Sequence, residues 1–217
     1  MNTEQKSIYA SAIGLVDWLG EQIGGIDLPA DLRSKMAAVC FGVTHEHYTA
    51  ITIVLGLPSP LFGTALALQR PLFETCTRGL WLSLCASDQD LLAFQSVKPP
   101  ETWRMLLALD QMHSKHESAA LHLRRIWKSA REQMNGFTHG GVEHFQGWQG
   151  GEELSPAYDW GDALRLLDFS ARIGILAASS LARIAMNSEL QEVILSQGIP
   201  QLEKIAQALS DVSAQQD

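Results

Sequence analysis

A long apolar stretch that carries three charged residues at helical spacing constrains the fold of this chain most. The stretch spans residues 65–86, and within it Arg70, Glu74 and Arg78 follow one another four positions apart. Residues four apart lie on one face of an α-helix, so these charges share one side of an otherwise apolar helix. Buried charges are costly unless they are paired or hydrated. The stretch therefore predicts a buried helix whose polar line faces other polar groups or water.

A second polar line repeats this spacing some sixty positions later. It consists of Arg131, Asn135 and His139 in the segment REQMNGFTHGG. The side chains offer a guanidinium, an amide and an imidazole, which can hydrogen-bond to the first line. We expect the two lines to meet between helices, either as a network that only fixes packing or as a site open to solvent.

The rest of the chain has the pattern of a helical protein. Apolar residues recur at helical spacing, while alternating runs rich in valine, isoleucine and threonine are missing. The sequence predicts one all-α domain over residues 1–217, a mostly up-and-down bundle of about six to eight helices. Pro71 predicts a restart or kink, Gly140 a left-handed stop, and Pro200 the start of a last helix after a short one at 188–195.

Charge and cysteine content narrow the functional classes. The net charge is −8, so the surface as a whole should repel nucleic acid. One basic patch departs from this trend and is either a nucleic-acid contact or a solvated helix face. Cysteines 40, 76 and 85 contain no CxxC pair and indicate reduced core thiols in a cytoplasmic protein. The basic patch consists of Arg124, Arg125, Lys128 and Arg131.

Membrane and metal functions are the weaker interpretations of this sequence. Residues 48–69 carry no charge and are long enough to span a bilayer, but glycines and prolines at their centre indicate a corner between two buried helices. A surface metal site could be formed by His113, His116 and Glu117, although the polar residues around them favour a solvated helix face. No Glu-x-x-His pair of a di-metal bundle occurs. We therefore expect no membrane association, cofactor or metal.

The polar lines also suit one kind of chemistry. A histidine such as His139 can move a proton near neutral pH, and Arg70 or Arg78 can stabilise a negatively charged phosphorane. Together they could cleave RNA through its own 2′-hydroxyl without a metal. Glu74 would orient an arginine or hold His139 in one tautomer, and Asn135 would complete the site.

Two short motifs resemble a known group of proteins. RPLFE at residues 70–74 and NGFTHGG at 135–141 resemble the paired motifs of helical bacterial families related to the HEPN superfamily, including abortive-infection-like proteins. The resemblance covers residues 61–141. It implies a helical bundle that forms a homodimer and cleaves or binds RNA in a defence or toxin–antitoxin setting, with an antitoxin or another protein as partner.

The sequence departs from the nuclease signature of that superfamily. The signature has an arginine, usually followed by Asn or another polar residue, four to six residues before a histidine. Here Met134 precedes Asn135, and Arg131 is separated from His139 by seven residues. Each residue of shift turns a side chain by about 100° around the helix. Two hypotheses follow: an RNA-binding or metal-independent ribonuclease effector, and a non-catalytic interaction protein whose polar network only fixes packing.

Overall fold

The computed structural model describes residues 1–96, 100–112, 119–148 and 157–214, and within these ranges all regular structure is helical. The predicted all-α bundle is confirmed. Eight of the ten helices in these ranges have nine residues or more, whereas α3 and α8 are shorter. The helices are α1 (Thr3–Ile23), α2 (Leu32–Leu55), α3 (Phe62–Ala67), α4 (Gln69–Leu84), α5 (Asp88–Ser96), α6 (Thr102–Met112), α7 (Ala119–His139), α8 (Val142–Gln146), α9 (Trp160–Ile184) and α10 (Ser188–Ala214).

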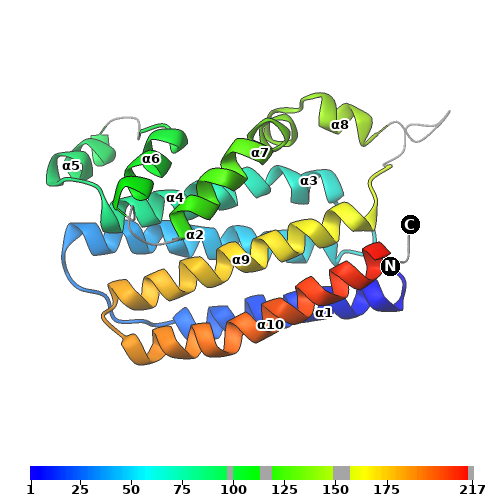
Figure 1. The fold of residues 1–217 in the computed structure, drawn as a ribbon, viewed down its shortest axis with the longest axis horizontal. Coiled ribbons are helices and arrows are strands. Elements are labelled where there is room, and N and C mark those ends of the chain that lie inside the picture. The colour runs from blue at the N-terminus through cyan, green and yellow to red at the C-terminus, as the bar shows by residue number, and fades with distance from the viewer. Residues whose placement is uncertain (97–99, 113–118, 149–156, 215–217) are drawn as a thin grey trace.

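The long helices stack in layers (Figure 1). Helices α1 and α10 pack on one another and on α9, which in turn packs against α2. Helix α4 runs alongside α2 and also packs on α9, and α6 and α7 pack on the side of α4 that faces away from them. Helix α4 therefore lies between the layer of α2 and α9 and the pair of α6 and α7.

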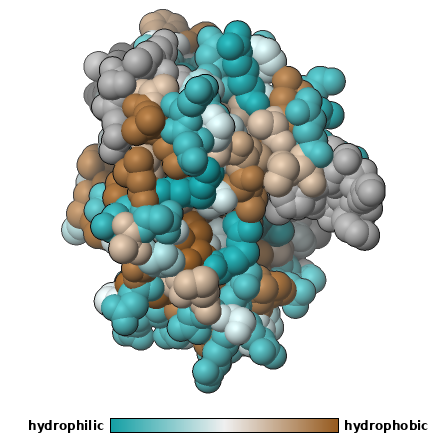
Figure 2. Space-filling view, turned by 90° about the vertical axis from the view of Figure 1, so that its left-hand side faces the viewer, coloured by the Kyte–Doolittle hydropathy of each residue, from teal (hydrophilic) through white to brown (hydrophobic). Residues whose placement is uncertain are grey.

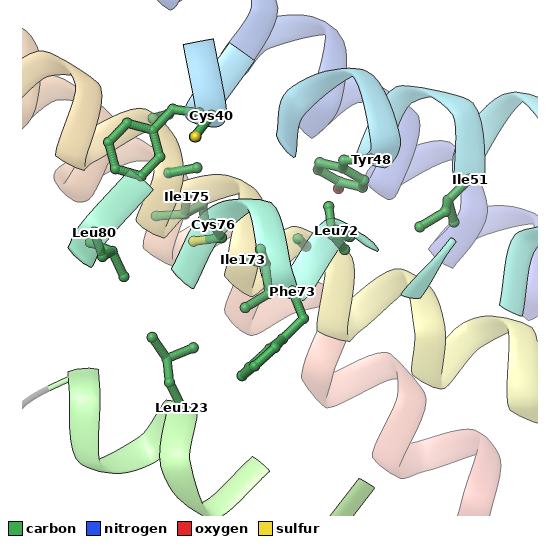
Figure 3. Packing of buried hydrophobic residues seen from close by; sticks show 14 of the residues in the cluster. Cys40, Tyr48, Ile51, Leu72, Phe73, Cys76, Leu80, Leu123, Ile173 and Ile175 are labelled. Atoms are coloured by element: carbon green, nitrogen blue, oxygen red, sulfur yellow. The ribbon is translucent and has the colours of Figure 1, made fainter. Parts of the chain in front are cut away.

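Helix α4 supplies the centre of the core. Leu72, Phe73 and Cys76 are fully buried. Cys76 lies near Ile175 of α9, and Phe73 stacks on Phe169 of α9 and on Trp127 of α7 (Figure 3). Burying one such side chain stabilises the fold by about 1.5–3 kcal/mol, so this face fixes the position of α4. The opposite face carries Arg70 and Glu74, whose side chains remain about one-fifth exposed at 23% and 20%. The buried helix with one polar line, predicted from residues 65–86, is thus present.

The break near Pro71 is a restart of the helix, the first of the two predicted alternatives. Helix α3 ends at Ala67 and α4 begins at Gln69, so Pro71 lies in the first turn of α4. The first turn has no intrahelical partner for its N–H groups, and proline is tolerated there. Arg70 consequently projects from the first turn of a new helix.

The predicted separate helix at Pro200 is wrong. Helix α10 runs without interruption from Ser188 to Ala214 and contains Pro200 in its interior. A proline removes one helical hydrogen bond, but α10 packs along both α1 and α9, and tertiary contacts outweigh that local loss. The left-handed stop predicted at Gly140 is confirmed by its φ of +70°.

The uncharged stretch at residues 48–69 forms the corner that the prolines predicted. Helix α2 ends at Leu55 and α3 begins at Phe62. Within the described ranges, no helix is long and apolar enough to cross a membrane. On the end of the molecule that lies to the left in Figure 1, hydrophilic and hydrophobic side chains are intermingled (Figure 2).

Candidate functional site

A cleft of about 500 Å³ opens between α4, the start of α6, and α7. It receives all three residues of the first polar line and two of the second, Arg131 and Asn135. The three helices pack directly on one another, which brings side chains some sixty positions apart to one place. The lining residues are Arg70, Glu74, Arg78, Pro100, Glu101, Thr102, Trp103, Trp127, Arg131, Glu132 and Asn135.

Arg70 joins the two polar lines. Its Nε donates to Glu74 Oε1 at 2.9 Å, and its Nη1 lies 2.7 Å from Nε2 of His139, the last residue of α7. A guanidinium has only donors, so His139 Nε2 accepts this hydrogen bond and the ring proton lies on Nδ1. Glu74 therefore orients the arginine, one of its two predicted roles, and does not contact His139 directly.

Thr102 is a member of this network that the sequence did not indicate. Its Oγ1 donates to Glu74 Oε1 at 3.2 Å from the first residue of α6, and the residue is buried. One carboxylate oxygen therefore holds an arginine of α4 and a hydroxyl of α6. A threonine at the start of a helix is common, so no local signal could have identified this role.

The predicted network does not extend to Asn135. Its Oδ1 is buried without a hydrogen-bond partner among the described residues, and the same holds for Arg78 Nε and Trp127 Nε1. All three side chains line the cleft. A buried polar atom without a partner costs about 1–3 kcal/mol. The hydrogen-bonded network therefore covers only the end of the cleft near Arg70.

The charges of the cleft are unevenly paired. Three arginines and three glutamates line it. Glu74 is engaged by Arg70, and Glu132 Oε1 lies 3.9 Å from Arg131 Nη2 at the exposed edge. Arg78 makes no hydrogen bond or ion pair with any other described residue. Its charge lowers the pKa of the Cys40 thiol, although burial has the larger effect and raises that pKa overall. Within the part of the chain that the structure describes, Arg78 is thus the arginine of the cleft wall without an ion-pair partner.

The predicted basic patch is not a surface of four unpaired cations. Arg124 forms an ion pair with Asp110 of α6, with 2.8 Å between Nη1 and Oδ2. Arg125 is exposed and lines neither hollow described here. Lys128 and Arg131 line a second hollow of about 380 Å³, together with Arg124. Asp110 lies on another helix, and its pairing could not be read from the spacing of the basic residues.

The NGFTHGG segment turns the chain as well as carrying His139. The N–H of Gly141 donates to the carbonyl of Gly136 at 2.7 Å, and Gly140 between them has a positive φ. This is the six-residue hydrogen bond of a Schellman helix end. A Cβ at Gly136 would overlap the carboxylate of Glu143 in α8. The three glycines therefore position α8, while His139 is exposed, contacts Arg70 and is not one of the residues that line the cleft.

Metal ligation has no support within the described part of the chain. No group of three or more His, Cys, Asp or Glu residues there could hold an ion. The segment with His113, His116 and Glu117 lies outside the described residues.

Comparison with known proteins gives a family and no activity. The chain matches no curated protein and no solved structure. The model of a family of unknown function, DUF6988, matches residues 41–205. The matched region includes α4, α6 and α7 in full, and with them the cleft and both polar lines. The chain is therefore a member of the DUF6988 family of unknown function.

Proposed function

We propose that this protein binds RNA, with the cleft between α4, α6 and α7 holding the phosphate backbone. The observation that carries the proposal is Arg78, an unpaired guanidinium in the wall of a cleft of about 500 Å³. Guanidinium groups bind phosphate oxygens through directed hydrogen bonds. The resemblance to the HEPN superfamily supports RNA as the class of ligand.

Other groups of the cleft suit a nucleotide. Arg131 stands at its exposed edge and can reach a second phosphate. The indole of Trp127 forms part of the wall and is held by stacking on Phe73, with 5.6 Å between ring centroids. Asn135 supplies an amide, which can hydrogen-bond to a base edge. The glutamates of the cleft limit its affinity for polyanions in general, so binding should be local and salt-dependent.

Metal-independent RNA cleavage is the second candidate, favoured by the 2.7 Å contact between Arg70 and His139. After Arg70 moves from Nε2 to the phosphate, Nε2 can accept the proton of a 2′-hydroxyl. The 2′-oxygen then attacks phosphorus, the bond to the 5′-oxygen breaks, and that oxygen leaves with a proton from water. Arg70 would stabilise the charge of the phosphorane. Met134, buried where the superfamily signature has arginine, argues for binding without cleavage.

We propose the biological setting on the resemblance alone. It consists of kinship with the HEPN superfamily, a cytoplasmic homodimer, and action in defence or with an antitoxin or another protein partner. The size of the protein in solution, measured by light scattering, tests the dimer directly.

The test of RNA binding compares Arg78→Gln with the parent protein. Anisotropy titrations of a labelled twenty-nucleotide single-stranded RNA are made at low and moderate salt. We expect the variant to bind about tenfold more weakly, with a salt slope smaller by about one phosphate contact. Arg165→Gln is the matched control, because Arg165 is an exposed arginine on α9 paired with Asp162. No binding by the parent protein, or equal binding by Arg78→Gln, overturns the proposal.

His139→Ala separates cleavage from packing. If the protein cleaves RNA, this variant should keep its affinity and lose the cleaved product on a gel. If the polar lines only fix packing, the variant should melt at a lower temperature, and the parent protein should neither bind nor cleave RNA at low salt.

A further inference from the structure

The second hollow continues the cleft along α6 and α7. The two share Trp103, Trp127 and Arg131 in their linings. Together they form one groove, in which the part near α4 is polar and the part near the middle of α6 is more apolar. The proposed function uses only the first part.

The lining of the second hollow combines an apolar floor with a basic rim. Leu106 and Trp127 are buried at its base, and Leu107 is partly exposed. Lys128 and Arg131 stand one helical turn apart on α7. None of the described residues that line it is acidic, in contrast to the cleft. A flat apolar group with a negative charge attached matches this arrangement.

Trp103 stands where the two parts meet. Trp103 is 44% exposed, whereas tryptophan is highly buried on average. Its Nε1 donates to the Glu101 carboxylate, and the guanidinium carbon of Arg104 lies 5.3 Å from the ring centroid. These contacts hold the indole in one orientation and leave almost half of it accessible. An exposed, oriented indole beside cationic side chains is a platform on which an unpaired base can stack.

We propose that the second hollow is a base-stacking subsite, so that the groove binds consecutive nucleotides of one single strand across Trp103. This inference rests on the proposed RNA binding and specifies its substrate as single-stranded RNA. The cleft holds phosphate at Arg78, while the hollow takes the neighbouring base between its apolar floor and the Trp103 ring. Lys128 and Arg131 then contact the phosphate on the far side of that base. A paired base cannot enter, because its edge and both faces are already engaged in the duplex.

The test compares Trp103→Ala with Trp148→Ala, which removes a tryptophan of similar exposure, 41%, that lines neither hollow. Three labelled ten-nucleotide probes are used in anisotropy titrations: a single strand, the duplex of the same sequence, and a strand of the same length without bases. We expect the parent protein to bind the single strand at least tenfold more tightly than the duplex. Trp103→Ala should weaken binding of the intact strand about tenfold and leave the baseless strand unchanged. Trp148→Ala should match the parent protein.

The outcomes separate this inference from the proposed function. If the parent protein binds RNA but Trp103→Ala binds the intact strand equally well, the subsite is wrong and the phosphate cleft stands. Equal weakening of intact and baseless strands also overturns stacking, provided thermal melting finds the variant folded. No RNA binding at all overturns both. If an acidic amphipathic helical peptide binds instead, and Trp103→Ala abolishes that binding, the hollow is a protein-docking site and the inference falls.

Discussion

The ion pair between Arg70 and Glu74 permits the sharpest test of how the site is built. We expect alanine substitutions at the two positions, made singly and together, to give a coupling free energy of about 1.5 kcal/mol. Exposed ion pairs couple by about 0.2–1 kcal/mol, whereas hydrogen bonds to charged groups contribute about 1.5–3 kcal/mol. The Nε–Oε1 distance is 2.9 Å and the side chains are 23% and 20% exposed, which places this pair near the boundary of the two ranges.

The two single variants should not be equally destabilised. Glu74→Ala removes the ion pair and also the acceptor of the Thr102 hydroxyl, and it leaves Arg70 in the first turn of α4. A positive charge there opposes the helix dipole by about 0.3–1 kcal/mol. Arg70→Ala removes the same ion pair and the hydrogen bond to His139, but the exposed imidazole can then hydrogen-bond to water, and the variant relieves the opposition to the helix dipole. We therefore expect Glu74→Ala to lower the free energy of unfolding by about 2 kcal/mol, and Arg70→Ala by clearly less.

Urea unfolding followed by circular dichroism measures all four proteins of this cycle. The matched control is the pair of Arg165 and Asp162 on α9, which is also near a helix start but 60% and 44% exposed. Its coupling should stay below about 0.5 kcal/mol. If the coupling free energy between Arg70 and Glu74 is no larger than that of the control pair, the claim that partial burial strengthens the Arg70–Glu74 ion pair is refuted. Equal losses for both single variants would refute the role assigned to Thr102 and the helix dipole.

Three further predictions concern the backbone, the thiols and pH. Gly140→Ala should lower the free energy of unfolding by about 1–2 kcal/mol, because φ is +70° and the added methyl meets no atom within 4 Å. Gly42→Ala, inside α2 and also with no atom within 4 Å of the added methyl, should raise the free energy of unfolding by about 1 kcal/mol. If urea unfolding shows that both alanine variants change the stability in the same direction, this reasoning is contradicted. Burial raises the pKa of Cys76 to about 12, so its thiol should react slowly at pH 8. Peptide mapping after thiol labelling should find Cys76 far less modified than the partly exposed Cys85, and equal labelling rates of the two cysteines would exclude the buried position of Cys76. Burial lowers the pKa of His45 below 6.5, although the negative charges of Asp17 and Glu46 raise it in part. The unfolded chain therefore binds the proton at a higher pH than the folded protein, and the free energy of unfolding falls as the pH drops from 6.5 through the folded pKa. His45→Gln should flatten this part of the plot of stability against pH, and an unchanged slope would assign it to other groups.

The helices and the grouping of charges along each polar line could be predicted because both depend on local geometry. Residues four apart share a helical face, so Arg70, Glu74 and Arg78 had to lie together once the apolar stretch formed a helix. Gly140 ends α7 because glycine adopts a positive φ without steric cost. Pro200 misled because its local cost of one hydrogen bond is smaller than the packing of α10 on two neighbouring helices.

The part of the site contributed by α6 could not be predicted. Thr102 and Trp103 belong to a short helix whose sequence has no unusual feature, and their roles arise only because α6 packs on α4 and α7. The ion pair of Asp110 with Arg124 has the same origin. Such contacts depend on the relative placement of helices, which no spacing within one helix specifies.

The polar groups of the cleft are paired at one end and unpaired at the other. At one end, Glu74 accepts hydrogen bonds from Arg70 and Thr102, which is how buried polar groups are normally satisfied. At the other end, Arg78 and Asn135 each keep a buried polar atom without a partner in the described structure. Two such atoms cost about 2–6 kcal/mol together, a large share of the 5–15 kcal/mol that stabilises a typical domain. Thr77 and Asp110, which line neither hollow, also keep buried polar atoms without a hydrogen-bond partner in the described structure, so the number of such atoms does not decide between binding and packing. The position of Arg78 in the cleft wall does, because the proposed RNA would supply its partner, and the RNA affinity of Arg78→Gln measures that contribution.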